Sequence, residues 1–461
     1  MKILLIQPAK PERALGGEEF SIFEPLALEY LAAGIPREHE VRILDMRIDP
    51  KLNLHLSEHH PDVVGITSFT VHVKTVKRLF RQIKEFDPAI LTVVGGHHAS
   101  IMPEDFYTPY IDVIVAGEGV FPFKEIISRR EKRTDLSGIT GAVGMMNGSV
   151  LIDNMAQDDD LDAVPFPRRD LTLTYRKSYF SEWMKPLASI RTSKGCLFRC
   201  RFCALWKLAN GRYLTRKPRC ILEELGTIDE KYVFFADDES LLDTERMTTL
   251  ASLIKEAGIK KRFFLYGRSD TIAKHPELVE RWKEVGLERV FIGLEFFRDV
   301  DLKRVRKGST AETNGKAVQI LKSLGIDIFP TFIILPEFDQ KDFLDLRKYC
   351  LDLELPFIGF SVLTPLPGTD LYNDVKDSLI TSSYDFVDFF HTLLPTKLPM
   401  KRFYQELADL YKHSRSLKNQ IRLLRKYRVR DLPSLFRTFG VFLKRLEKLE
   451  HDYGVEGRDE E

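Results

Sequence analysis

The sequence predicts an α/β protein built from two successive series of alternating strands and helices, followed by a helical C-terminal region. Short apolar runs alternate with helical stretches from residue 1 to about 130, and again from about 186 to 372. After Pro367 the pattern becomes predominantly helical. The 461 residues suffice for about two to four domains, each able to bury its own core.

Residues 1–135 form the first series, with helical patterns such as Leu26–Ala33 and Val73–Phe86 between the apolar runs. Strands are predicted at Lys2–Gln7, Val41–Asp45, Val63–Thr67, Leu91–Val94 and Val113–Val115. Strands that alternate with helices of this length form right-handed βαβ units and hence a parallel sheet. Five such strands predict a flavodoxin-like, doubly wound domain whose ligand site lies at the carboxyl ends of the strands.

The second series spans residues 186–372 and follows a polar linker over 136–185, in which a hairpin is predicted around Gly141–Ile152. Its helices include Glu277–Val285 and Thr313–Leu324. Its strands are predicted at Ala188–Arg191, Val233–Ala236, Phe263–Tyr266, Val290–Leu294, Ile328–Ile334 and Ile358–Leu363. These βα units are two fewer than a closed eightfold barrel needs, so the series predicts a partial (β/α)6 barrel.

Residues 373–461 are predicted to form a helical C-terminal region, with helices in Lys401–Lys412, Arg415–Tyr427 and Leu432–Leu449 and a disordered acidic tail over Gly454–Glu461. Between Lys412 and Lys448 about a dozen basic residues face two acidic ones. Two interpretations stay open. The basic helix with its phenylalanines lies on an anionic membrane surface, or it is an ordinary helical cap with solvated charges. The phenylalanines are Phe436, Phe439 and Phe442.

Composition excludes several classes of protein. The formal net charge of +1 gives the protein no overall attraction to nucleic acid. The sequence contains no run of eighteen apolar residues, so no transmembrane helix is expected. Pro8 interrupts the short apolar N-terminus, which argues against a secretory signal and favours the cytoplasm. Five cysteines in so long a chain argue against a disulfide scaffold, and we expect Cys220 and Cys350 to be small buried apolar residues.

The most informative motif is Cys196-x₃-Cys200-x₂-Cys203, which follows a predicted strand and opens a loop. Three thiolates at this spacing suit a cubane iron–sulfur cluster with one iron left open. The alternatives are a zinc knuckle and a cluster for electron transfer only, both of which normally need a fourth ligand nearby. The remaining cysteines are remote in sequence, which favours the cubane with an open iron.

This motif, with Phe202 before its last cysteine, resembles the signature of the radical S-adenosylmethionine (SAM) superfamily. The resemblance implies that Cys196, Cys200 and Cys203 hold a [4Fe–4S] cluster, that SAM chelates its open iron, and that one electron releases a 5′-deoxyadenosyl radical. It also implies SAM contacts at the ends of later strands. These candidates are Phe202, Asp237, Asp238, Arg268, Ser269 and Glu295.

Within that set the resemblance assigns particular roles. Arg268 would pair with the SAM carboxylate and Glu295 would accept hydrogen bonds from ribose or ammonium, whereas Asp237 and Asp238 are equal candidates for the methionine end. Solvated loop charges or helix caps are the alternative roles for these side chains. Leu335–Asp339 departs from the glycine-rich turn that relatives often carry there, which leaves the adenine contacts unassigned.

The N-terminal series resembles the cobalamin-binding domain that precedes the barrel in one class of radical SAM enzymes. The resemblance rests on loops after strands, and its candidate contacts are Gln7, Pro8, Thr67, Ser68, Gly95, Gly96, His97, Gly117 and Glu118. Glycines there let the backbone approach a corrin or nucleotide tail closely. The Asp-x-His-x-x-Gly motif that supplies a cobalt ligand is absent, so neither His97 nor His98 is expected to bind cobalt. A flavodoxin-like domain without a cofactor is the alternative.

The domain order is similar to that of cobalamin-dependent (class B) radical SAM methylases, and Asp388–Tyr404 is similar to the C-terminal region of hopanoid C-3 methylases. The resemblance implies methylation of an unactivated carbon of a hydrophobic substrate, for which a triterpenoid is the candidate. It also implies flavodoxin or ferredoxin as electron donor and peripheral membrane contact. A cobalamin-dependent cyclase or rearrangement enzyme is the second hypothesis. A non-catalytic iron–sulfur redox protein is the third.

Overall fold

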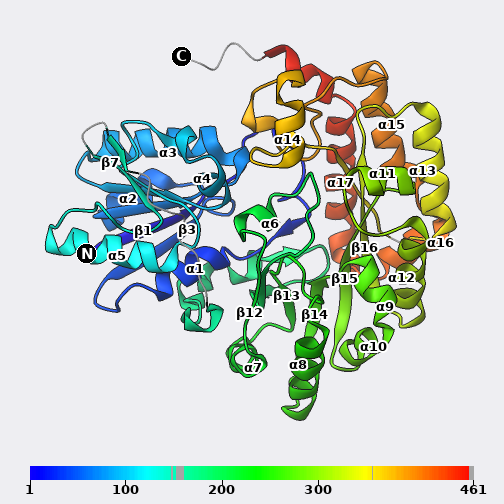
Figure 1. The fold of residues 1–461 in the computed structure, drawn as a ribbon, viewed down its shortest axis with the longest axis horizontal. Coiled ribbons are helices and arrows are strands. Elements are labelled where there is room, and N and C mark those ends of the chain that lie inside the picture. The colour runs from blue at the N-terminus through cyan, green and yellow to red at the C-terminus, as the bar shows by residue number, and fades with distance from the viewer. Residues whose placement is uncertain (147–148, 152–159, 356, 456–461) are drawn as a thin grey trace.

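The computed structural model describes residues 1–461 except 147–148, 152–159, 356 and 456–461. Figure 1 shows the N-terminal sheet on one side of the molecule and the C-terminal helices on the other, with a second sheet between them. Both sheets belong to βα series, so the predicted α/β class is confirmed.

The N-terminal sheet has the strand order β3-β1-β4-β5-β6-β7-β8, and its first five strands are parallel. The parallel strands are β1 (Lys2–Gln7), β3 (Glu40–Asp45), β4 (Val63–Thr67), β5 (Leu91–Gly95) and β6 (Val113–Val115). This order is that of flavodoxin-like folds, so the predicted topology is confirmed. All five predicted strands are present, each within a residue of its expected bounds.

Helices cover both faces of this sheet, as a doubly wound fold requires. One apolar cluster joins the sheet to the helices around α3, and a second joins it to α1 and α5. The helices of this half are α1 (Leu26–Ala33), α2 (Leu52–His59), α3 (Val73–Phe86), α4 (His97–Ile101) and α5 (Val120–Lys132). Burial on both faces explains why strands such as β1 are almost continuously apolar.

The predicted hairpin is present and extends the N-terminal sheet. Its strands β7 (Ala142–Met146) and β8 (Ser149–Leu151) are antiparallel, and β7 pairs with β6. The sheet therefore continues past residue 135. Part of the hairpin prediction, over residues 147–148 and 152, lies outside the described residues.

The second sheet contains six parallel strands in sequence order, which confirms the predicted partial barrel. They are β10 (Leu187–Ile190), β13 (Tyr232–Phe235), β14 (Arg262–Tyr266), β15 (Leu287–Glu295), β16 (Asp327–Ile334) and β17 (Gly359–Val362). The helices between them are α7 (Pro218–Gly226), α8 (Thr244–Glu256), α9 (Ser269–Lys274), α10 (Pro276–Glu284), α11 (Asp299–Arg304), α12 (Ala311–Ser323) and α13 (Gln340–Asp352).

The barrel is open between its edge strands β10 and β17. Two short strands, β2 (Ser21–Ile22) and β9 (Phe180–Ser181), pair with each other outside the six-stranded sheet. The chain before β10 is more ordered than the predicted linker, because it forms a ten-residue 3₁₀ helix over Arg169–Ser178. Buried Arg176 of this helix pairs with the carboxylates of Glu24 and Glu230, which attaches it to both halves of the protein.

The C-terminal helices are α15 (Met400–His413), α16 (Leu417–Leu424) and α17 (Leu432–Leu446), which confirms the three predicted helical segments. The predicted tail lies, from residue 456 onward, outside the described residues. The phenylalanines of α17 differ in exposure. Phe442 is 3% exposed and packs in the barrel's core cluster, whereas Phe436 is 58% exposed.

Two further observations concern burial. Cys350 is buried as predicted, but Cys220 is only half-buried on α7, so its prediction as a buried apolar residue was wrong. Across the described ranges, no helix combines the length and the apolar character that crossing a membrane demands.

His391 connects distant segments of the C-terminal region. Its ring nitrogens lie 2.8 Å from Asp388 Oδ2 and 3.1 Å from Asp452 Oδ2, and Asp388 Oδ2 also accepts a hydrogen bond from the backbone N–H of Leu15. Burial disfavours the charged ring, but the two carboxylates outweigh burial and raise the pKa of His391 to about 8.

Stability should therefore fall as the pH rises through the pKa of His391. The raised pKa contributes to stability fully below pH about 6.5 and loses that contribution through pH about 8, by about 2 kcal/mol. We expect the urea midpoint of the wild type to drop between pH 6 and pH 9 by more than that of His391→Gln. Equal drops in the two proteins would contradict this assignment.

Candidate functional site

A cavity of about 220 Å³ lies where the carboxyl ends of the N-terminal strands meet the barrel. The ends of β4, β5 and β6 and the loops after β5 and β6 form one wall, and Arg191 and Lys194, which follow β10, belong to the other. Six of the predicted cobalamin contacts line it: Thr67, Gly95, Gly96, His97, Gly117 and Glu118. The structure therefore brings together residues from the carboxyl ends of three neighbouring strands, where a doubly wound sheet binds its ligand.

Gly96 shows why a glycine stands at this edge. Its φ of 101° lies in the left-handed region, and an added Cβ would lie 2.8 Å from the backbone N of Ser68. The other three predicted contacts do not line the cavity. Ser68 is buried and its backbone N–H donates to Gly95 O, while Gln7 donates its side-chain N–H to the carbonyl of the neighbouring Pro8.

Glu118 spans the cavity from the N-terminal domain to the barrel. Its carboxylate accepts hydrogen bonds from Lys194 and, at 3.2 Å, from Arg191. His97 lies nearby with its ring open to the cavity. Enclosure by both domains lowers the pKa of His97 although Asp238 and Glu118 oppose that shift, so the ring is neutral near pH 7.

The cysteine loop starts two residues after Lys194, at the end of a small hairpin. Strands β11 (Ser193–Gly195) and β12 (Tyr213–Thr215) pair on either side of it. Gly195 has a φ of 88°, and an added Cβ would lie 2.1 Å from the carbonyl oxygen of Arg212, so this hairpin requires glycine.

The three cysteines of the motif are free thiols that lie close enough together for each to influence the pKa of a neighbour. Burial raises the pKa of each, to about 12 for Cys203, while Lys307 and Arg268 act in the opposite direction on Cys200. Within the described part of the chain, no three His, Cys, Asp or Glu side chains surround one metal position. Thiolates of a cubane bind three different irons, so they need not converge on a single point.

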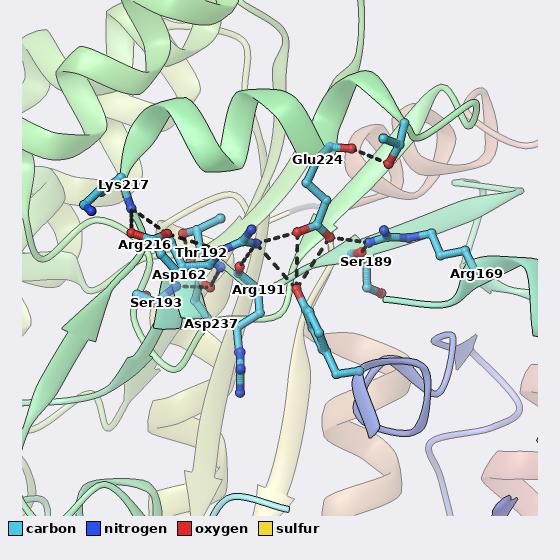
Figure 2. Close-up of polar contacts among 12 residues, drawn as sticks. Asp162, Arg169, Ser189, Arg191, Thr192, Ser193, Arg216, Lys217, Glu224 and Asp237 are labelled. Carbon is cyan, nitrogen blue, oxygen red and sulfur yellow. Dashed lines mark hydrogen bonds and ion pairs between the residues drawn. The ribbon is translucent and has the colours of Figure 1, made fainter. Parts of the chain in front are cut away.

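The two aspartates after β13 have different surroundings. Asp237 is 3% exposed and accepts from the backbone N–H groups of Thr192 and Ser193 and from the Thr192 hydroxyl, at 2.6–2.9 Å (Figure 2). Asp238 accepts one hydrogen bond, from the N–H of Gly195 at 2.7 Å, and faces His97 electrostatically. Asp237 is therefore fully engaged in supporting the strand that leads to the cysteine loop.

Figure 2 also shows a buried ion network behind this loop, centred on Glu224 of α7. The Glu224 carboxylate accepts from Arg169 at 2.7 Å and from Arg216 at 2.5 Å. It also accepts from the hydroxyl of Tyr30, which comes from α1 of the N-terminal domain. This network joins the linker, the barrel and the N-terminal domain beside the cavity.

The remaining predicted SAM contacts cluster at the ends of β14 and β15. Arg268 is buried over the ring of Phe198 and is already bonded to Asp270 and to the Lys307 carbonyl. Ser269 is fully buried and donates to Asn314, while Phe202 packs against the barrel core.

Glu295 ends β15 in a strained backbone conformation, with a φ of 63°. Its carboxylate pairs with Lys307 Nζ at 2.7 Å, directly over Gly293, where an added Cβ would lie 2.3 Å from the Glu295 carboxylate. Gly293 therefore leaves the space that the Glu295–Lys307 pair occupies.

The roles of Arg191, Lys194 and Lys307 were missed from the sequence. Lys194 precedes the first cysteine by two residues, but nothing in the local pattern indicates that it reaches Glu118, seventy-six residues earlier. Lys307 lies twelve residues after its partner Glu295, and the local pattern does not indicate that pairing either.

Comparison with known families assigns both halves of the site. Residues 13–127 match the B12 binding domain, and residues 190–350 match the radical SAM superfamily. The hopanoid C-3 methylase of Methylococcus capsulatus is 29% identical over 472 residues, covering 98% of this chain and 89% of that protein. An uncharacterized methyltransferase of Pyrococcus horikoshii is 29% identical over 390 residues, covering 81% of this chain and 82% of that protein.

Solved structures have the same fold. The cobalamin-dependent SAM radical enzyme OxsB, with aqua-cobalamin and SAM bound, superimposes with a TM-score of 0.71 at 18% identity. That match covers 88% of this chain and 66% of OxsB, less than two thirds of its length. The methyltransferase TsrM of Kitasatospora setae, with cobalamin and a [4Fe–4S] cluster bound, gives 0.68 at 17% identity and covers 91% of this chain and 90% of TsrM. The chain thus combines a B12 binding domain with a radical SAM domain, the two domains that together bind cobalamin, a [4Fe–4S] cluster and SAM, and over nearly its full length it is similar to a cobalamin-dependent radical SAM methylase.

Proposed function

We propose that this protein transfers a methyl group to an unactivated carbon of a polycyclic triterpenoid of the hopanoid type. The observation that carries the proposal is the shared cavity, because its walls come from the cobalamin-type domain and from the strand that leads to the cysteine motif. Near full-length similarity to a hopanoid C-3 methylase supports the substrate class.

Three cysteines, Cys196, Cys200 and Cys203, would hold the cluster, and a small one-electron donor such as flavodoxin or ferredoxin would reduce it. Buried cations support this assignment, since Lys307 and Arg268 favour negative charge at Cys200. When bound, the cofactors supply a radical that removes a hydrogen atom from the substrate and a methyl group that replaces it.

Asp238 and Glu295 would bind the polar groups of SAM. Asp238 keeps carboxylate lone pairs beyond its one hydrogen bond, and Glu295 is held at the strand end by Lys307. Asp237 and Ser269, whose polar atoms are engaged within the protein, would position the loops that surround SAM. Arg268 would form the wall beside Cys200, because it already binds Asp270.

Cobalamin would occupy the cavity above Gly95 and Gly117. Backbone without side chains permits close approach of a flat ligand there, and Thr67 offers a hydroxyl for its amides. His97 would border cobalamin as a neutral ring rather than bind cobalt, in keeping with the absent histidine motif.

The surface of α16 and α17 supports peripheral contact with an anionic membrane, where such a substrate resides. Large apolar side chains are exposed there among the basic residues: Leu417 (72%), Val429 (83%), Phe436 (58%) and Val441 (61%). Exposed apolar residues beside cations favour binding at a charged lipid surface.

Methyl transfer is tested with reconstituted protein, methyl-labelled SAM, a one-electron reductant and a pentacyclic triterpenoid alcohol presented in anionic vesicles. We expect one labelled methyl group in each product, and one 5′-deoxyadenosine and one S-adenosylhomocysteine for each turnover. A new ring or rearranged skeleton without label would contradict the proposal and favour the cyclase hypothesis, since magnesium-protoporphyrin cyclases are also similar to this chain.

The same assay tests the membrane surface. Val429→Ser together with Val441→Ser should lower vesicle binding and turnover but leave substrate-free SAM cleavage within about twofold, because both side chains are exposed. Unchanged vesicle binding would contradict the membrane contact.

The cluster assignment is tested by single changes of Cys196, Cys200 and Cys203 to Ala. The wild type should carry about four irons per chain after anaerobic reconstitution, and each variant should lose the cluster and SAM cleavage. Cys220→Ala is the matched control, since this thiol is half-buried away from the motif. Retained SAM cleavage in any motif variant would overturn the assignment.

The cobalamin site is tested by Gly95→Leu. An added Cβ at Gly95 has Val115 as its nearest neighbour, at 3.7 Å, so the loop tolerates a side chain that fills the cavity. We expect hydroxocobalamin affinity to fall at least about tenfold, whereas Gly226→Leu, placed in open space, should bind normally. Equal affinity in both variants would place cobalamin elsewhere.

A further inference from the structure

A second cavity, of about 340 Å³, lies beside the open edge of the barrel at β17. Its walls come from β16 and β17, from α16 and α17, and from the segment around Phe20. We call it the aromatic chamber, defined by Phe329, Phe360, Tyr411, Phe436 and Phe439. Neither the cysteine motif nor the cobalamin-type loops contribute to it.

The chamber is suited to an apolar ligand. Its aromatic side chains present rigid faces, and small residues at Gly359 and Ser361 leave room between them. Phe436 lines the chamber and is also 58% exposed, so the chamber adjoins the basic, apolar surface of α16 and α17. A ligand that leaves a membrane at that surface would reach the chamber directly.

Arg415 gives the chamber one polar end. It lies 5.6 Å from the centroid of Phe439 and donates one hydrogen bond, from Nη2 to the Tyr411 carbonyl. In the part of the chain that the structure describes, no carboxylate lies within ion-pair distance of Arg415, because Glu182 pairs with Arg289 instead. A guanidinium has five N–H donors, so Arg415 retains donors for an oxygen atom of a ligand.

The opposite end of the chamber approaches the catalytic side of the barrel. Thr331 lines the chamber and pairs in register with Gly293, over which the Glu295–Lys307 pair lies. Adjacent strands are about 4.8 Å apart, so one strand spacing separates the chamber wall from that pair. Glu182 also lines the chamber, and it pairs with Arg289 of β15. Arg289 lies beside Asp327, which is four residues before Thr331 on β16. The Glu182 end of the chamber is therefore about 13 Å from Thr331 along the strand.

We propose that the aromatic chamber binds an amphipathic polycyclic lipid, with the hydrocarbon rings against its aromatic walls and an oxygen of the polar end bonded to Arg415. The inference rests on the proposed function in taking this lipid to be the substrate. The rings then point along β16 and β17 toward the carboxyl ends of these strands, beside Glu295 of β15. The polar end of the lipid remains near the amino ends of β16 and β17.

Binding is measured with full-length protein that lacks added cofactors, so the result does not depend on turnover. The probe is dehydroergosterol, a fluorescent tetracyclic alcohol, and energy transfer from Trp183 reports its position, because Trp183 lies 5.9 Å from Tyr427 of the chamber. We expect saturable binding. Ser361→Phe, which fills the chamber, should weaken it at least about tenfold, whereas Ser323→Phe, an exposed change on α12, should not.

The polar end is tested separately. Arg415→Gln should weaken binding of the sterol alcohol at least about fivefold and leave binding of its 3-deoxy hydrocarbon analogue unchanged. Arg422→Gln, which changes an exposed arginine on α16, is the control. Equal losses for alcohol and hydrocarbon would overturn the role of Arg415. A sterol carboxylate that binds more tightly than the alcohol would identify an acidic lipid as the preferred ligand of the same site.

Other outcomes decide the chamber itself. Unchanged binding in Ser361→Phe would overturn it, and if that variant does not fold, Leu424→Phe on the facing helix decides in its place. Binding at the chamber without any methyl transfer would overturn the proposed function alone. Methyl transfer that Ser361→Phe and Leu424→Phe leave intact would overturn the chamber as the substrate site alone.

Discussion

Two buried carboxylates, Glu24 and Glu224, connect the two parallel sheets. Glu24 enters from the N-terminal domain and binds Arg176 and the backbone of Ser189, and Glu224 enters from α7 and binds Arg169, Arg216 and Tyr30. Both are nearly or fully inaccessible to solvent, and each lies beside two arginines that compensate its charge inside the protein. Because these contacts cross from one domain to the other, they hold the carboxyl ends of the N-terminal strands against the loop that carries the cysteines.

The geometry of the cavity follows from that attachment. A parallel sheet gathers its loops at one edge, and the ion network sets two such edges face to face. Glu118 then bonds to Arg191 and Lys194 on the far side, and Asp237 supports the strand end from which those cations project. The charged groups between the two domains are therefore held in place by hydrogen bonds, which limits the reorganisation that charge transfer beside them would require.

The C-terminal helices serve two surfaces at once. Their inner side chains, Phe442 among them, extend the barrel core at its open edge, where the sheet alone would leave strands uncovered. Their outer side chains remain exposed beside a dozen basic residues. Phe436 and Phe439 lie between these layers, at the wall of the aromatic chamber. α17 thus covers the open barrel edge with one side and faces solvent with the other.

Local pattern was sufficient for the strands, most of the helices and the cysteine motif, because periodicity and spacing are properties of adjacent residues. All eleven expected strands are present, and the glycines expected to approach a ligand lie at the end of β5 and after β5 and β6, where they line the cavity. Long-range contacts decided the rest. Nothing near Asp237 or Asp238 indicates that the first is saturated by Thr192 and Ser193, and nothing near Phe442 distinguishes it from exposed Phe436. Those distinctions depend on which distant segments fold against each side chain, and a linear pattern does not contain that information.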